Sequence, residues 1–152
     1  MSPSAAELLA LDALTLREAD GGALDLAAQA RRIQESLHCA HALGVWREGQ
    51  LVAYVLLQPQ ELGRAFVRGF CLHPDWRQAG VLLDLLRAVL AWVTEHGVSE
   101  LHSHVRKGNA ESLALHRQLG FAVVAENEWA YAFVAHAEAL TRHPVLRRAA
   151  RN

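Results

Sequence analysis

The sequence predicts an α/β fold in which a mixed central β-sheet is flanked by helices on both faces. One observation is that segments with the strand period of two alternate along the chain with segments of helical period. The other is that two pairs of strand segments are separated by only a few residues, which predicts antiparallel hairpins within the sheet. The expected order of elements is βα-βββ-α-β-α-ββ.

Length and composition are those of one folded domain. The chain has 152 residues, of which 52% are hydrophobic and 20% charged, and a chain of this size can bury a core. We expect a single domain over 1–152, with 143–152 as a basic, frayed tail. The longest apolar stretch, 81–93, includes Asp84 and Arg87, so no membrane-spanning segment is expected.

Charge and cysteine content exclude several classes of partner. The 15 Lys and Arg balance 16 Asp and Glu, so neither nucleic acid nor an anionic membrane is expected to bind. Residues 1–14 lack a basic residue and include Glu7 and Asp12, unlike a signal peptide. The two cysteines, Cys39 and Cys71, are too few for a disulfide framework, and the expected location is the cytoplasm.

The first half of the chain contains the clearest hairpin. Residues 13–18 alternate enough to predict a first strand, and an amphipathic helix is expected after Gly22 on the spacing of Leu24, Ala27, Ala28, Arg31 and Glu35. Residues 41–59 read as two strands around the turn Arg47-Glu48-Gly49-Gln50, in which glycine can take a positive φ. A third strand over 64–72 is stopped by Pro74.

The second half contains two helices and three strands. A broad apolar face predicts a helix from Gly80 to about residue 96 on the positions Leu82, Leu83, Leu85, Leu86, Val89, Leu90 and Val93. Residues 99–106 predict a strand with Leu101, Ser103 and Val105 on one face. A short helix over 109–120 is capped by Asn109 and ended by Gly120, and strands over 121–126 and 128–135 follow.

The connection from the third strand to the helix at Gly80 has the properties of a phosphate-binding turn. A helix start carries unpaired N–H groups and the positive end of the helix dipole, and a glycine there lets a ligand approach the backbone. The alternative is an ordinary strand-to-helix turn, and this stretch alone does not decide between them.

Two motifs resemble those of the GNAT acyltransferases, which use acetyl-coenzyme A. Pro74, Trp76, Arg77 and Gly80 are in register with the family pattern P-x-aromatic-R-G-x-G-x-G/A. The second motif, N-x-x-A/S-x-x-L-Tyr-x-x-x-Gly-Phe, is matched by Asn109, Ser112, Leu115, Leu119, Gly120 and Phe121. The resemblance covers roughly residues 45–125, and two motifs at the expected separation are more specific than one.

The resemblance implies a coenzyme site. Backbone N–H groups from about Gln78 to Leu82 would hold the pyrophosphate, and the N–H groups of Phe70 and Leu72 would polarise the thioester carbonyl. Asn109 would contact the pantetheine as well as cap its helix, although a cap alone remains open. The implied coenzyme-binding residues are Phe70, Leu72, Arg77, Gln78, Ala79, Gly80, Val81, Leu82, Asn109 and Ser112.

The phosphate-binding motif departs from the family pattern at two places. Leu82 replaces its last small residue, and Gln78-Ala79 replaces a glycine and a cation. The Leu82 side chain can point into the core, which leaves its N–H available for phosphate, or toward the ligand, which blocks close approach.

The acid and base of the reaction are less clearly marked. His116 stands where the family usually has a tyrosine that protonates the leaving thiolate; imidazole can serve that role, and a solvated helix histidine is the alternative. Phe66 occupies the strand position of a glutamate base in some relatives, so no protein base is assigned. A water chain, Glu126 or Glu128 remain open.

No metal site is expected. His102 and His104 share a strand face but lack a convincing third ligand, so a structural or acceptor-facing position is preferred. Cys71 is expected to be a buried small hydrophobe. The terminal strand carries Trp129, Tyr131 and Phe133, which could serve the interface of a homodimer.

The sequence therefore predicts an N-acetyltransferase that transfers the acetyl group of acetyl-coenzyme A to a small-molecule or peptide amine by direct attack in a ternary complex. The alternative function, which rests on Leu82, Gln78-Ala79 and His116, is a module that binds an acyl-coenzyme A or a protein partner without turnover.

Overall fold

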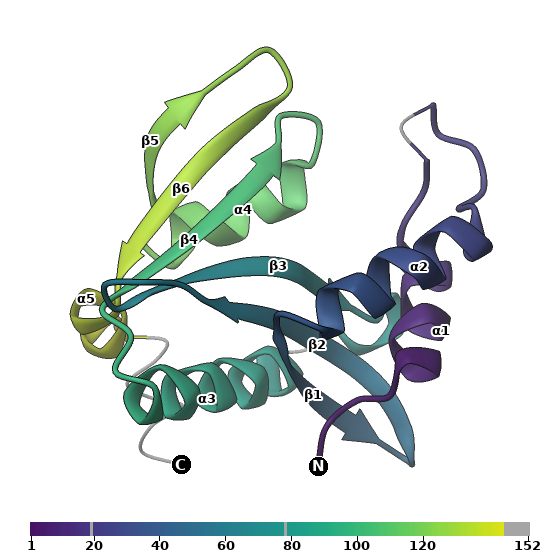
Figure 1. The fold of residues 1–152 in the computed structure, drawn as a ribbon, viewed down its shortest axis with the longest axis horizontal. Coiled ribbons are helices and arrows are strands. Elements are labelled where there is room, and N and C mark those ends of the chain that lie inside the picture. The colour runs from purple at the N-terminus through teal and green to yellow at the C-terminus, as the bar shows by residue number, and fades with distance from the viewer. Residues whose placement is uncertain (19, 78, 145–152) are drawn as a thin grey trace. The chain divides into compact units, whose positions relative to one another are not determined.

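The structure is a computed structural model that describes residues 1–18, 20–77 and 79–144 (Figure 1). Gln78 and most of the expected tail, 145–152, lie outside the described residues. The elements are α1 (Ala5–Thr15), α2 (Leu26–Leu37), β1 (His41–Arg47), β2 (Gln50–Pro59), β3 (Arg64–Leu72), η1 (Pro74–Trp76), α3 (Ala79–Glu95), β4 (Glu100–Arg106), α4 (Ala110–Gln118), β5 (Ala122–Glu126), β6 (Ala130–His136) and α5 (Ala137–Arg142).

The strands form a mixed sheet in the order β1-β2-β3-β4-β6-β5. Strands β3 and β4 are parallel, whereas β1–β2, β4–β6 and β5–β6 are antiparallel. The mixed sheet with helices confirms the expected fold class.

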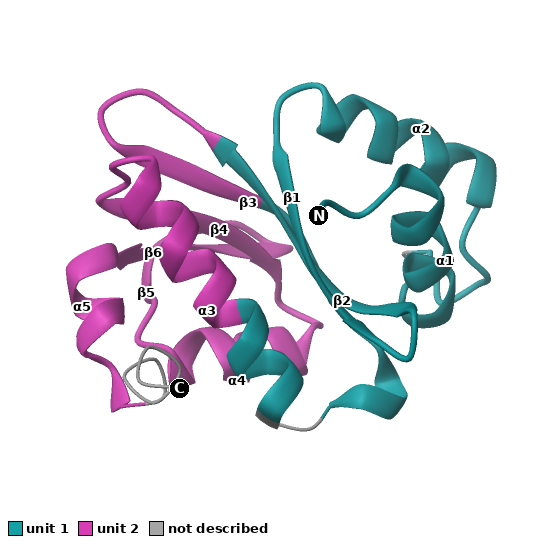
Figure 2. Cartoon of the chain, turned by 90° about the horizontal axis from the view of Figure 1, so that it is seen from below, with its two compact units in different colours: residues 1–58, 68–85 teal, residues 59–67, 86–152 magenta. Residues whose placement is uncertain are grey.

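The chain divides into two compact units (Figure 2). Unit 1 comprises residues 1–58 and 68–85, and unit 2 comprises residues 59–67 and 86–152. Both β3 and α3 contribute residues to each unit. A single domain over 1–152 stays a prediction.

The first strand expected from the sequence is wrong, because the chain begins with a helix. Ser4 and Glu7 form a capping box at the start of α1: the Glu7 N–H donates to Ser4 Oγ (3.1 Å) and the Ser4 N–H donates to Glu7 Oε1 (3.0 Å). Leu8 and Leu11, three positions apart on one helix face, are buried. Capping and burial of this face outweigh the weak alternation of 13–18.

The second helix is confirmed, but its buried face was assigned to the wrong residues. Helix α2 begins after Asp25, whose side chain accepts from the Ala28 N–H. Its buried residues are Ile33 and Ser36, whereas Arg31 and Glu35, expected on the apolar stripe, are exposed.

The hairpin of unit 1 is confirmed and carries the core. Its turn residues Glu48 and Gly49 have φ of 53° and 77°, the left-handed pair that a tight hairpin requires. All residues of β2 from 51 to 57 are buried.

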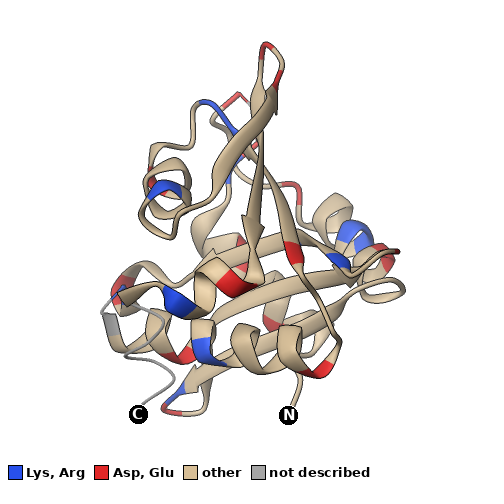
Figure 3. Ribbon diagram, turned by 90° about the vertical axis from the view of Figure 1, so that its left-hand side faces the viewer, with Lys and Arg blue, Asp and Glu red and all other residues tan. Residues whose placement is uncertain are grey.

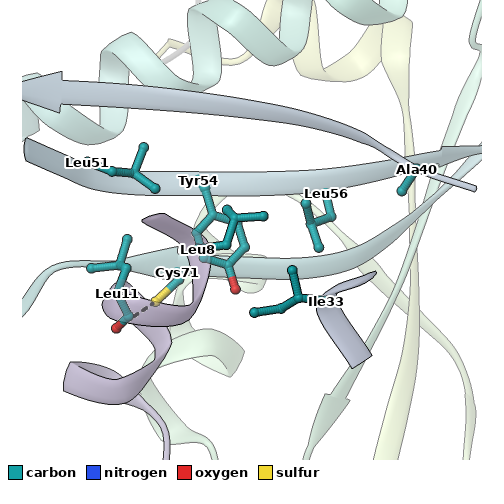
Figure 4. Packing of buried hydrophobic residues seen from close by; sticks show 8 residues of the cluster. All are labelled: Leu8, Leu11, Ile33, Ala40, Leu51, Tyr54, Leu56 and Cys71. Carbon is teal, nitrogen blue, oxygen red and sulfur yellow. Dashed lines mark hydrogen bonds between the residues drawn. The ribbon is translucent and has the colours of Figure 1, made fainter. Parts of the chain in front are cut away.

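Both faces of β2 are covered. In Figure 2, α1 and α2 lie on one side of β2 and the first turns of α3 lie on the other. Figure 4 shows the cluster under α1 and α2, which consists of Leu8, Leu11, Ile33, Ala40, Leu51, Tyr54, Leu56 and Cys71.

A fully buried carboxylate connects the elements of unit 1. Asp12 on α1 is 0% exposed and accepts hydrogen bonds from the Tyr54 hydroxyl (2.5 Å) and the Gln29 side-chain amide (2.9 Å). Burial raises the pKa of Asp12, and these two hydrogen bonds oppose the rise. Asp12 therefore ties α1 to β2 and α2 through hydrogen bonds that water cannot readily replace, because the carboxylate is buried.

Cys71 on β3 packs against the end of the same helix. Its sulfur lies 2.8 Å from Thr15 Oγ1 and 4.0 Å from the Leu11 carbonyl oxygen, a contact drawn in Figure 4. Burial raises the pKa of Cys71 to about 12, so the side chain stays a thiol at neutral pH. These observations fit the small buried residue expected from the sequence.

Unit 2 packs α4 against β4 and β6 (Figure 1). Leu101, Ser103 and Val105 are buried, as the alternation predicted. Val105 packs with Leu113 of α4 and Phe133 of β6. This covered face of the sheet alternates along β4 with residues that are half-buried or exposed.

The end of the chain differs in part from its expectation. Residues 137–142, which follow the last strand, form the helix α5. Of the aromatic residues expected at an interface, Trp129 is 71% exposed whereas Phe133 is 1% exposed and belongs to the core. Phe133 is therefore not available to a partner.

Charges of both signs are interspersed along the described elements in Figure 3, in agreement with the net charge of −1. Among the described residues, no helix combines the length and the apolar character that crossing a membrane requires.

Replacement of the buried carboxylate is expected to destabilise the protein. Asp12→Ala leaves the buried Tyr54 hydroxyl and the half-buried Gln29 amide without their acceptor, and we expect a loss of about 2 to 3 kcal/mol in the free energy of unfolding. Urea denaturation measures this loss, with Glu35→Ala on the exposed face of α2 as the control. Equal stability of both variants would contradict the role given to Asp12.

Candidate active site

At the end of β3, neighbouring side chains lie on opposite faces of the strand. Cys71 points into the cluster under α1, and its neighbours Phe70 and Leu72 are half-buried. Side chains alternate across a strand, so Phe70 and Leu72 lie on the other face. The packing of Cys71 against Thr15 and Leu11 therefore fixes the backbone on which the Phe70 and Leu72 N–H groups are carried.

The turn after β3 is held by a buried histidine. The His73 N–H donates to the Val52 carbonyl oxygen (2.8 Å), and His73 Nδ1 accepts from the Asp75 N–H (3.0 Å). The Trp76 N–H donates to the His73 carbonyl oxygen (3.0 Å) and closes the single turn η1. These bonds bind the connection to β2 and direct the chain toward α3.

The first turn of α3 leaves its backbone accessible. Ala79 to Leu82 are the first four residues of α3, whose N–H groups belong to the set that a helix start leaves without partners inside the helix. Gly80 is exposed, and a Cβ built on it meets no heavy atom within 4 Å. Any side chain at this position would fill that space. Open space above donor groups at the positive end of a 17-residue helix fits a phosphate ligand.

The buried stripe of α3 agrees in part with the expected apolar face: Leu85 and Val93 were expected in it, whereas Val81 and Trp92 were not. Val81 and Leu85 are 2% and 1% exposed, and Trp92 and Val93 continue the stripe. Leu82 is half-buried, because it stands about 100° around the helix from Val81. Its side chain thus lies beside the buried stripe. It is neither fully in the core nor fully exposed toward a ligand, the two alternatives that the sequence left open.

The remaining residues of this turn are placed as follows. Arg77 is exposed and follows η1, and Ala79 is the first residue of α3. Gln78 lies outside the described residues. In the second turn of α3, Asp84 accepts from Arg47 of β1 at 2.6 Å, which attaches the helix to the hairpin of unit 1.

The start of α4 in unit 2 carries the second motif. Asn109 is the N-cap, and its Oδ1 accepts from the Ser112 N–H (3.1 Å). The cap expected from the sequence is confirmed; a ligand contact by Asn109 or Ser112 stays a prediction. Ser112 is half-buried and lies one turn before His116.

His116 is held on both ring nitrogens. Nδ1 lies 2.7 Å from the Ser112 carbonyl oxygen and Nε2 lies 3.0 Å from Ser103 Oγ. A carbonyl only accepts, so Nδ1 carries the proton and Nε2 of the neutral ring accepts from the serine hydroxyl. The rings of Phe121 and Phe133 lie 4.9 Å away. Burial lowers the pKa of His116, and the bond to the Ser112 carbonyl partly offsets this.

The candidate bases differ in their partners. Glu126 accepts from Lys107 Nζ at 2.7 Å, which occupies it in an ion pair, and Glu128 is exposed. His102 Nε2 lies 3.0 Å from Glu100 Oε2. Sequence reasoning missed this pair, although two residues of one strand separated by one position share a face.

The described residues contain no group of three or more His, Cys, Asp or Glu side chains that could hold a metal ion.

Comparison with known proteins identifies the family. The sequence pattern described as "Acetyltransferase (GNAT) family" matches residues 8–121, more than half of the chain. The chain belongs to the GNAT family. The resemblance found in its two motifs is thereby confirmed, and acetyl-coenzyme A is the acyl donor that the GNAT fold uses.

Curated relatives of this GNAT chain are similar over a limited segment. An aminoglycoside N(6')-acetyltransferase type 1 of Stenotrophomonas maltophilia is 39% identical over 56 residues, which are 37% of each chain. The enzyme of the same name from Acinetobacter genomosp. 13 is 37% identical over 57 residues, 38% of this chain and 39% of the relative. The match thus spans little more than a third of these relatives.

Solved GNAT structures resemble the chain over most of its length. An aminoglycoside 6'-acetyltransferase type Ii has a TM-score of 0.72 at 15% identity, with 88% of this chain and 89% of the other covered. PaiA N-acetyltransferase of Thermoplasma acidophilum, in complex with coenzyme A, has a TM-score of 0.70 at 14% identity and coverage of 87% and 92%. At such identities the likeness establishes the fold.

The lowered pKa of His116 predicts a specific pH dependence of stability. Because the unfolded chain binds this proton more readily, the contribution of the neutral ring is complete above about pH 6.5 and is lost as the pH falls toward the folded-state pKa. We expect the free energy of unfolding of His116→Gln to decrease less between pH 7.5 and 5.5 than that of the wild type.

Urea denaturation at the two pH values measures the difference, with the exposed His38→Gln as the control. A decrease in His116→Gln as steep as in the wild type would show that His116 does not carry this dependence.

Proposed function

We propose that this GNAT protein transfers the acetyl group of acetyl-coenzyme A to the amine of a small molecule, in a ternary complex. The observation that carries the proposal is the open first turn of α3 at Gly80, reached directly from the end of β3 through η1. The named activity of the aminoglycoside acetyltransferases similar to this chain supports a small-molecule amine as acceptor.

The first turn of α3 would hold the pyrophosphate. The N–H groups of the described residues Ala79 to Leu82 would supply donors at the positive end of the helix, and Arg77 would add a cation. Leu82 is half-buried, so part of its side chain is packed against the protein and does not stand free in solvent. This position supports the contribution of its N–H despite the missing small residue.

Strand β3 would orient the acyl group. When bound, acetyl-coenzyme A supplies an acyl carbon on a thioester, which a neutral amine can attack. The N–H groups of Phe70 and Leu72 would donate to the carbonyl oxygen on which negative charge develops. Cys71, fixed between them by Thr15 and Leu11, keeps these donors in place. A bond forms between nitrogen and carbon, the carbon–sulfur bond breaks, and the products are an amide and a thiol.

The second motif supplies three further assignments. We assign Asn109 and Ser112 to pantetheine binding and His116 to protonation of the sulfur. The Ser112 carbonyl holds Nδ1–H of His116, so Nε2 is the atom that takes up a proton and passes it on. Its lowered pKa makes the imidazolium a stronger acid, which favours transfer to the leaving sulfur.

Two measurements test the function. Thermal unfolding with and without acetyl-coenzyme A reports binding, and thiol release is followed with kanamycin A, spermidine and an alanyl peptide as amines. Stabilisation with thiol release is the expected result. No stabilisation at millimolar coenzyme would overturn the coenzyme site, and stabilisation without thiol release from any amine would favour a binding module without turnover.

A side chain at Gly80 is expected to weaken coenzyme binding without destabilising the free protein. In Gly80→Glu a carboxylate fills the open space above the first turn of α3 and repels the pyrophosphate, so we expect acetyl-coenzyme A to bind at least about tenfold more weakly, which is 1.4 kcal/mol. Isothermal titration calorimetry measures this change. Ala91→Glu, on the exposed side of the same helix, is the control, and equal affinities would reject the assignment.

Removal of the His116 ring is expected to slow turnover. His116→Gln keeps a polar side chain near Ser103 but cannot donate an imidazolium proton, and general acid catalysis contributes on the order of a hundredfold. We therefore expect kcat to decrease by about that factor with little change in the affinity for acetyl-coenzyme A. A variant that retains the full rate would remove the acid role from His116.

A further inference from the structure

A buried histidine side chain stands between the end of β3 and the start of α3. His73 is 7% exposed, and its Nδ1 accepts from the Asp75 N–H at 3.0 Å. Val52, His73, η1 and the first turn of α3 all belong to unit 1. The side chain therefore lies in the same compact unit as the turn that is assigned to the pyrophosphate.

Each N–H group of η1 already has a partner. Pro74 has no N–H, the Asp75 N–H is bound by the imidazole of His73, and the Trp76 N–H donates to the His73 carbonyl oxygen at 3.0 Å. Without the imidazole, the Asp75 N–H would be one of the donors that a helical turn leaves without a partner. The turn is therefore closed before any ligand binds, and α3 begins only three positions after Trp76.

The imidazole of His73 serves as the acceptor that asparagine or aspartate supplies in an Asx-turn, where a side chain binds the backbone N–H two residues further along the chain. Pro74 favours an extended residue before it, and His73 has φ of −57° and ψ of 132°. A ring nitrogen that accepts a hydrogen bond carries no proton, so the neutral ring has its proton on Nε2. The bond thus requires one particular tautomer of His73.

The neighbouring elements are held by other bonds. The His73 N–H donates to the Val52 carbonyl oxygen at 2.8 Å, which keeps the end of β3 on β2 whatever the side chain at position 73. Asp84 in the second turn of α3 pairs with Arg47 of β1 at 2.6 Å. Loss of the imidazole acceptor is therefore expected to affect residues 75–77 and the entry into α3 more than the strand or the whole helix.

The bond from Asp75 to His73 is expected to matter more for binding than for stability. Asp75 is exposed, so water can bind its N–H when the imidazole acceptor is gone. Residues 75–77 would then sample more conformations, and a ligand at the start of α3 would have to order them again. Ordering the backbone of even one residue costs about as much as a tenfold loss of affinity, and a turn that is ordered beforehand avoids this cost.

We propose that the side chain of His73 is the positioning residue of the coenzyme-binding turn. Its Nδ1 holds η1 in the conformation that directs the N–H groups of the first turn of α3 toward the pyrophosphate. The inference rests on the proposed function, in which this turn binds acetyl-coenzyme A. His73 contacts no reacting atom in this role, so it sets the affinity for the coenzyme and not the rate of acyl transfer.

Two substitutions at position 73 separate positioning from packing. His73→Leu fills the buried site but has no acceptor, whereas His73→Asn offers Oδ1 to the Asp75 N–H, as in an Asx-turn, but leaves a cavity where the ring was. Isothermal titration calorimetry is expected to show that His73→Leu binds acetyl-coenzyme A about tenfold more weakly than the wild type. His73→Asn is expected to keep an affinity close to that of the wild type.

Urea denaturation of the same two variants is expected to give the opposite order, because the cavity makes His73→Asn the less stable protein. If His73 had only a structural role, affinity would follow stability and His73→Asn would be the weaker binder. That result, or a His73→Leu protein with wild-type affinity, would overturn the proposal.

A matched control removes a bond of the same kind elsewhere in unit 1. The Asp25 side chain accepts from the Ala28 N–H at the start of α2 (3.1 Å), and Asp25→Ala is expected to leave the affinity for acetyl-coenzyme A unchanged. In steady-state kinetics, His73→Leu is expected to raise the KM for acetyl-coenzyme A about tenfold at unchanged kcat. A decrease in kcat at unchanged KM would contradict a positioning role at the coenzyme turn.

A measurement on the wild type tests the geometry without any variant, and it also serves if His73→Leu does not fold. Nitrogen-15 spectra of the imidazole side chains in the free protein are expected to give His73 as the Nε2–H tautomer. An Nδ1–H tautomer would overturn the proposal, because that nitrogen could not accept from the Asp75 N–H.

Failure of the proposed function is recognised separately. If the wild type does not bind acetyl-coenzyme A in the calorimeter, the coenzyme site is wrong and the role of His73 falls with it, whatever its tautomer. If the wild type binds the coenzyme and His73→Leu binds it equally well, the role of His73 alone is wrong.

Discussion

The connection between β3 and α3 is the constraint on which the proposed chemistry depends. It is fixed by His73, whose N–H is bound to the Val52 carbonyl of β2 and whose Nδ1 accepts from the Asp75 N–H. The donors of Phe70 and Leu72 precede this connection, and the first turn of α3 follows it. The hydrogen bonds of His73 thus hold the end of β3 on β2 and close the turn η1 that follows it, and the Arg47–Asp84 pair attaches α3 to the same hairpin. Pre-organised backbone donors are effective because no reorganisation is needed when a ligand binds.

Much of the fold could be predicted from the sequence, because the strands and the long helix have clear periods. The hairpin around Gly49, the strand before Pro74 and the helix after Gly80 were predicted with the correct type. The first element was not, since 13–18 alternate locally whereas the signal that decides the matter is the capping box of Ser4 and Glu7. Tertiary packing also determines which faces of α2 and α3 are buried, because the buried side of a helix depends on the strands against which it packs.

In the candidate site, too, local features could be predicted from the sequence, whereas contacts between distant residues could not. Residues within the two motifs lie on the elements expected for them, because local capping and turn chemistry place Asn109 and Gly80. Contacts between distant residues could not be predicted: Ser103 is 13 positions from His116, and Tyr54 is 42 positions from Asp12. Glu100 and His102 are close in sequence, but the hydrogen bond between their side chains is seen only in the structure.

The central claim, that the end of β3 and the start of α3 bind acetyl-coenzyme A through backbone N–H groups, is tested most directly by amide chemical shifts. Titration of acetyl-coenzyme A into nitrogen-15-labelled protein should give its largest shifts at Phe70, Leu72, Gly80 and Val81, whose N–H groups would become donors to the ligand. Saturable binding with the largest shifts elsewhere, and these four amides unchanged, would contradict the account.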